Sequence, residues 1–209
     1  YAEYERTSPT DRGRWLADRL AAKDAVRTAL WDEGTAEVYP TELRIDLPTN
    51  GRPLATDVRG RGFGDFSVSI AHQGEATVAI ARRRADPAQP DGPGAGIDIA
   101  EMTEPDDGRV ALAISEAEQA KLHALGASDR TYWFAVIQAA KAAAAKAHGT
   151  GSGNLARFEV LEVTRDHALV EGGRQRYDVQ HCTMKNPDDL PTREYVVAWT
   201  FGPRVAESP

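Results

Sequence analysis

The sequence DRTYWFAVIQAAKAAAAKAHGTG, residues 129–151, contains the most strongly helical segment of the chain. Alanine has the highest intrinsic helix propensity, so its repeated use predicts a helix over residues 129–148. Gly149 follows directly, and a glycine at this point is typical of a helix C-terminus. Downstream of the helix, alternating polar and apolar residues predict a meander of four strands. Their expected ranges are 158–163, 167–170, 176–181 and 194–201.

The first half of the chain offers a similar combination of one helix and short strands. An amphipathic helix is expected over residues 14–31, because its apolar residues recur at helical spacing. Its larger apolar positions are Leu16, Leu20, Val26 and Leu30. Two strands, 66–70 and 76–81, are expected to be joined by a turn at Gln73-Gly74.

Residues 82–94 separate the two halves and are rich in arginine, proline and glycine, a composition typical of a connector. We therefore expect two domains, residues 1–90 and 91–209. The expected fold class is α+β, with two similar halves that each pack a small antiparallel sheet with a long helix.

The composition limits the classes of function. The chain has 209 residues and a formal net charge of −7, which argues against non-specific binding to nucleic acid. No apolar run approaches the roughly 20 residues that a membrane-spanning helix needs. Cys182 is the single cysteine, so no internal disulfide can form and a reducing, cytoplasmic location is expected. Because the chain opens without methionine, we expect it to be a segment of a longer protein.

Three segments contain residues suited to chemistry. GIDIAE, residues 96–101, places Asp98 in a short apolar strand, where a carboxylate can bind a metal ion or cap a loop. Residues 141–151 carry lysines ahead of a Gly-Thr-Gly sequence, which suits either phosphate binding or a solvated helix face. SIAHQG, residues 69–74, contains His72, which either contacts a ligand or packs within the fold. Taken alone, each segment also has an ordinary structural interpretation.

In combination and in this order, the segments resemble the 4'-phosphopantetheinyl transferase superfamily over residues 14–151. The matching motifs are Arg19…Lys23…Arg27, Gly51-Arg52-Pro53, SIAH (69–72), GIDIAE (96–101), SEAE (115–118) and KAAAAKAHGTG (141–151). The chain is also similar to transferase domains fused to polyketide synthases, including those of enediyne antibiotic pathways. Such enzymes move the phosphopantetheine arm of coenzyme A onto a serine of an acyl carrier protein, with magnesium. The resemblance therefore implies coenzyme A as substrate, Mg²⁺ as cofactor and an acyl carrier protein as partner.

The same resemblance implies roles for individual residues. Asp98 and Lys146 are the expected catalytic residues, with Asp98 and Glu101 as the metal ligands. The side chains expected to bind coenzyme A are Arg19, Lys23, Arg52, His72, Lys141 and Lys146. In this interpretation the coenzyme lies in the cleft between the two halves.

The helix motif departs from the family at one position. Where the family has Lys-Glu-Ala, this chain has Lys141-Ala142-Ala143, so Ala142 replaces a glutamate that binds metal. Ala100 likewise stands where an Asp-x-Glu pattern has its second acid. Ala142 is either an engineered, inactivating substitution or a natural change in a degenerate domain. Three hypotheses follow: a transferase, a non-catalytic scaffold that binds coenzyme A or carrier protein, and an unrelated α+β interaction domain.

Overall fold

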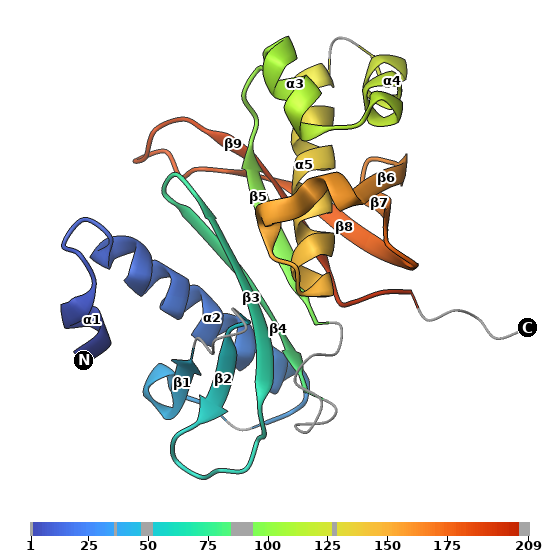
Figure 1. Ribbon diagram of the computed structural model, residues 1–209. Coiled ribbons are helices and arrows are strands. Elements are labelled where there is room, and N and C mark those ends of the chain that lie inside the picture. Colours follow the sequence, from blue (N-terminus) through green and yellow to red (C-terminus); the bar gives the residue numbers. More distant parts are fainter. Residues whose placement is uncertain (1, 36, 47–51, 85–93, 127–128, 205–209) are drawn as a thin grey trace, which may run out of the picture. The chain divides into compact units, whose positions relative to one another are not determined.

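The computed structural model describes residues 2–35, 37–46, 52–84, 94–126 and 129–204. The chain divides into two compact units, Tyr1–Pro90 and Asp91–Pro209. Each unit contains one antiparallel sheet and one long helix, drawn in blue to teal for the first unit and in green to red for the second (Figure 1). The predicted α+β fold class with two antiparallel sheets is confirmed.

In the first unit, helix α2 (Arg12–Asp32) packs against a sheet with the strand order β1-β2-β3-β4. The buried face of α2 is formed by residues spaced four apart, Ala22, Val26 and Leu30. Leu16 and Leu20, by contrast, are 44% and 56% exposed. The remaining elements of this unit are α1 (Ala2–Arg6), the 3-10 helix η1 (Pro40–Glu42), β1 (Leu43–Asp46), β2 (Leu54–Asp57), β3 (Phe66–Gln73) and β4 (Ala76–Arg83).

In the second unit, helix α5 (Arg130–His148) lies across a five-stranded sheet with the order β5-β9-β8-β7-β6 (Figure 1). The alanines of α5 let the helix approach the sheet closely, and most of them are fully buried in the core. The strands are β5 (Gly96–Glu101), β6 (Phe158–Val163), β7 (His167–Gly172), β8 (Gln175–Lys185) and β9 (Glu194–Thr200). The other helices are α3 (Asp107–Ala113), α4 (Glu116–Ala124) and the 3-10 helix η3 (Ser152–Arg157).

Most predicted elements are confirmed, and the bounds of several of them differ from the predicted ones by a few residues. The four strands of the meander are present, and the turn between β3 and β4 uses Gly74 with a φ of 56°. Strand β4 continues to Arg83, so the segment predicted as a connector begins inside a strand. Residues 85–93 of that connector lie outside the described residues.

Helix α3 was not expected from the sequence. The Asp106 carboxylate caps its first turn by accepting a hydrogen bond from the backbone N–H of Arg109.

Across the residues that the structure describes, no helix has both the length and the apolar character needed to cross a membrane.

Candidate functional site

Strand β5 lies directly against helix α5 because the strand begins with glycine. A Cβ atom on Gly96 would lie 2.0 Å from the carbonyl oxygen of Ala143 and 2.7 Å from the backbone nitrogen of Ala147. A larger residue at this point would therefore force the close-packed backbones apart. Side chains alternate between the two faces of a strand. Asp98, two residues after Gly96, points to the same face and hence toward α5.

Lys146 meets Asp98 on this face. Its Nζ donates to Oδ1 of Asp98 at 2.7 Å and to the carbonyl oxygen of Ile97 at 3.0 Å. The Lys146 and Asp98 side chains are 21% and 22% exposed, so a small anion in solvent can reach the pair. Lys146 belongs to the last turn of α5, which ends at Gly149 in the left-handed conformation (φ 92°). The structure thus brings the two expected catalytic residues into contact.

Lys141 is in a different environment from the one predicted. The side chain is 2% exposed, and its Nζ donates at 2.7 Å to Oε2 of Glu118, which is 0% exposed. The other carboxylate oxygen of Glu118 accepts from the backbone N–H of Val160 at 2.8 Å. Because its charge is compensated inside the unit, Lys141 forms a structural ion pair and not the expected contact with phosphate. Glu118 also forms a capping box with Ser115 at the start of α4. The sequence gave no sign of its pairing with Lys141.

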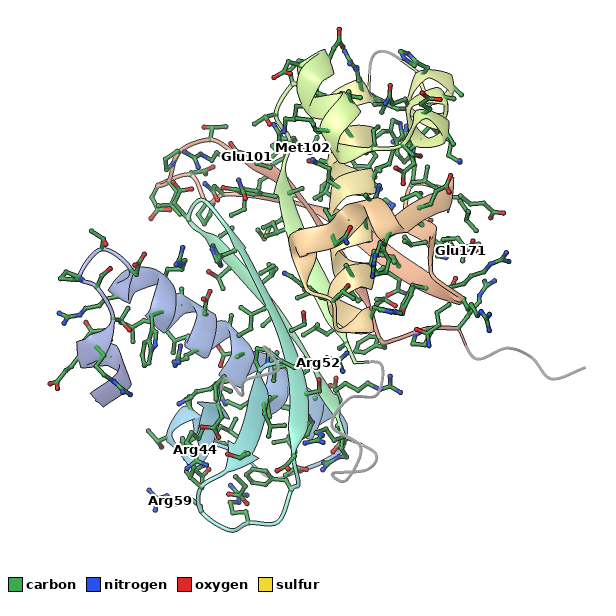
Figure 2. All side chains as sticks on the ribbon, in the orientation of Figure 1. Arg44, Arg52, Arg59, Glu101, Met102 and Glu171 are labelled. Carbon is green, nitrogen blue, oxygen red and sulfur yellow. The ribbon has the colours of Figure 1, made fainter. Side chains whose placement is uncertain are left out.

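Glu101 does not join Asp98. The two residues are three apart along β5, so their side chains point to opposite faces of the strand. Oε1 of Glu101 lies 3.7 Å from Nε of Arg193, and Figure 2 shows Glu101 at the end of β5, next to Met102. The expected pair of metal ligands, Asp98 and Glu101, is therefore not assembled.

The other described positions near Asp98 do not complete a magnesium site. Magnesium takes hard oxygen ligands in a near-octahedral arrangement. Ala100 shares the strand face of Asp98, and Ala142 lies one helical turn before Lys146, yet neither side chain carries an oxygen. Within the described ranges, no three His, Cys, Asp or Glu side chains gather as they would around a metal ion. The donor set does not fit the magnesium ion that the resemblance implied.

Two of the expected basic side chains share one face of α2 in the first unit. Arg19 and Lys23 are spaced four apart, which places them one turn apart on the helix. The guanidinium of Arg19 lies over the ring of Trp15, with its Cζ 3.6 Å from the ring centroid, a cation–π contact that orients it. Burial and the positive charge of Arg19 lower the pKa of Lys23. Two like charges held this close favour the binding of an anion beside them.

His72 and Arg52 lie on and beside the sheet of the same unit. His72 is near the end of β3, and its Nδ1 is 3.7 Å from Oδ1 of Asp18 on α2. Arg52 lies two residues before β2 (Figure 2), and the backbone N–H of Val68 on β3 donates to the carbonyl oxygen of Pro53 at 3.0 Å. Sequence reasoning missed Asp18, because an acid among expected anion-binding residues carries no signal of its own.

Comparison with known proteins gives the chain a family. It is similar to a holo-(acyl-carrier-protein) synthase from Bacillus anthracis str. Ames, solved in complex with CoA (3',5'-ADP). That similarity has 24% sequence identity and a TM-score of 0.40, and it covers 54% of this chain and 97% of the other. The comparison with curated proteins gave no match. The sequence profile of the 4'-phosphopantetheinyl transferase superfamily matches residues 94–200, just over half of the chain. This chain belongs to the 4'-phosphopantetheinyl transferase superfamily.

Proposed function

We propose that this chain transfers the 4'-phosphopantetheine arm of coenzyme A to a serine of an acyl carrier protein. The observation that supports this function is the 2.7 Å contact between Asp98 and Lys146, which come from two motifs 48 residues apart. A cation held beside a carboxylate, and reachable from solvent, is suited to binding a phosphate oxygen. The family match covers both motifs.

The reaction needs little covalent chemistry from the protein. The serine oxygen attacks the phosphorus that carries the pantetheine arm, the bond from that phosphorus to the bridging oxygen breaks, and 3',5'-ADP leaves. The serine proton passes to water. Lys146 would bind the diphosphate and offset the charge that develops on the leaving oxygen, while Asp98 fixes the position of its ammonium group. Catalysis would therefore come mainly from positioning and charge.

The first unit would hold the nucleotide end of coenzyme A. Its candidate residues are Arg19, Lys23, Arg52 and His72, which carry cationic or hydrogen-bonding groups suited to phosphate. Lys141 is left out of this set because its charge is paired with Glu118 inside the second unit. We place the carrier protein in a polyketide synthase, because the motif combination resembles transferase domains fused to such synthases.

A non-catalytic domain is the second candidate, and Ala142 favours it. This residue occupies the position of the family glutamate, is 3% exposed and carries no group that could act as a base or ligand. A domain of this kind would bind coenzyme A or a carrier protein without transfer.

A transfer assay separates the two candidates. The chain is mixed with coenzyme A and an acidic acyl carrier protein, and the carrier protein is weighed by mass spectrometry. Transfer adds the mass of phosphopantetheine, and Lys146→Gln should slow it by roughly 10- to 100-fold, the loss of one charged hydrogen bond. Lys185→Gln is the matched control, because Lys185 is an exposed lysine at the end of β8. Binding of coenzyme A without any transfer would support the scaffold instead.

A further inference from the structure

Lys146 supplies a positive charge beside the Asp98 carboxylate, at the position where the family would hold a metal ion. Lys146 places its ammonium group 2.7 Å from Oδ1 of Asp98, a normal distance for a charge-assisted hydrogen bond. The carbonyl oxygen of Ile97 accepts from the same ammonium group at 3.0 Å and fixes its position further. One negative and one positive charge therefore offset each other at this point.

A divalent metal ion at Asp98 would need further carboxylate ligands, and within the part of the chain that the structure describes no three His, Cys, Asp or Glu side chains gather there. The strand face that carries Asp98 continues with Ala100, and the turn of α5 before Lys146 carries Ala142. Glu101 points to the opposite strand face, where its carboxylate lies 3.7 Å from Arg193. A metal at Asp98 would thus meet one carboxylate whose charge Lys146 has already compensated.

We propose that the ammonium group of Lys146 takes the place of a divalent metal ion, and that the chain binds the diphosphate of coenzyme A at Asp98 without magnesium. The ligand in this inference rests on the proposed function. An ammonium group has several N–H donors and can link a carboxylate to a phosphate oxygen, as a metal ion does. It does so with one positive charge and no fixed coordination geometry, which suits a position with a single carboxylate.

Binding of manganese tests the metal half of the proposal on the protein alone. Mn²⁺ takes the same oxygen ligands as Mg²⁺ and is visible by electron paramagnetic resonance. The wild-type chain and Asp98→Asn should bind Mn²⁺ equally weakly, through scattered surface carboxylates. One Mn²⁺ bound by the wild type roughly tenfold more tightly than by Asp98→Asn would overturn the proposal. Asp98→Asn introduces no larger side chain and no new buried charge, so we expect both proteins to fold and the comparison to be valid.

A variant with restored acids shows that the assay can detect a site. Ala142→Glu, alone and together with Ala100→Glu, adds one carboxylate on α5, which faces Asp98, and a second on the same face of β5 as Asp98. We expect at least one of these folded variants to bind Mn²⁺ roughly tenfold more tightly than the wild type. Where both bind no better than the wild type, the missing acids are not what excludes the metal, and the inference from the donor set is wrong.

Calorimetry with coenzyme A tests the second half of the proposal, that the diphosphate binds without magnesium. The dissociation constant should change by no more than about twofold between a buffer with EDTA and a buffer with Mg²⁺. A loss of affinity of roughly tenfold or more in EDTA would overturn the proposal. An absence of binding in both buffers would overturn the proposed function and this half of the inference, while the manganese comparison still decides the first half.

Discussion

The ammonium group of Lys141 lies 2.7 Å from the carboxylate of Glu118 in the interior of the second unit, where these side chains are 2% and 0% exposed. Glu118 also accepts hydrogen bonds from the backbone N–H groups of Ser115 and Val160, both at 2.8 Å. The pair therefore ties α4 and α5 to the start of β6. A buried ion pair is tolerated when each charge has its partner and its hydrogen bonds are made. Loss of one partner leaves the other charge buried and uncompensated.

Lys141→Met should destabilise the protein without changing its affinity for coenzyme A. We expect the free energy of unfolding in urea to fall by about 3 kcal/mol, because the Glu118 carboxylate would stay buried without its cation. Lys121→Met is the matched control on α4, where a partly exposed lysine should cost less than about 1 kcal/mol. If Lys141 bound phosphate instead, its replacement would weaken binding of coenzyme A and leave stability unchanged.

Gly96→Ala should loosen the contact between β5 and α5. Its Cβ would lie 2.0 Å from the carbonyl oxygen of Ala143, and a rigid backbone atom cannot rotate away. We expect a loss of about 3 kcal/mol in the free energy of unfolding, measured in urea. Gly153→Ala is the control, because no atom lies within 4 Å of its added Cβ, and it should change stability by less than about 0.5 kcal/mol. Equal stability of the two variants would contradict the close approach.

The sequence predicts elements better than it predicts the partners of charged residues. Helix α5 follows from its alanines and from Gly149, which are local signals. The partner of Lys141 does not, because Glu118 lies 23 residues earlier and meets it through the packing of two helices. Glu101 is a different case: its distance of three residues from Asp98 already places the two carboxylates on opposite faces of any regular strand. The separation of Asp98 and Glu101 could therefore have been predicted from their spacing in the sequence and the alternation of side chains along a strand.

Stability should decrease as the pH falls below the ordinary pKa of histidine, because of His181. This side chain is 4% exposed, and its Nε2 lies 3.0 Å from the carbonyl oxygen of Thr164. Burial lowers the pKa of His181 from its ordinary value of 6.5. Between the lowered pKa and pH 6.5 the unfolded chain therefore binds more protons than the folded chain. The contribution of this group is complete above pH 6.5 and is lost as the pH falls toward the lowered pKa.

Urea unfolding at a series of pH values measures this loss. The slope from His181 should approach about 1.4 kcal/mol per pH unit within that window. His181→Gln keeps an N–H donor for the carbonyl oxygen of Thr164 and does not titrate, so it should flatten the profile there. His123→Gln, at an exposed position of α4, should leave the profile unchanged. An unaltered slope in His181→Gln would assign the pH dependence to other groups.

Lys23 should make the binding of 3',5'-ADP depend on pH in the alkaline range. Burial and the nearby charge of Arg19 lower the pKa of Lys23 from 10.5. A phosphate bound beside these two cations would stabilise the charged form of Lys23 and raise its pKa again. Binding then takes up protons, so affinity should fall as the pH rises through the lowered pKa of free Lys23.

Calorimetric titration with 3',5'-ADP at a series of alkaline pH values tests this dependence. Lys23→Gln should bind more weakly, by roughly tenfold, and should lose most of the alkaline decrease in affinity. Lys185→Gln removes an exposed lysine of the second unit and should keep the wild-type profile. A Lys23→Gln variant with the wild-type affinity and the wild-type profile would remove Lys23 from the ligand site. Arg19, Arg52 and His72 would then be the remaining candidates for the nucleotide phosphates.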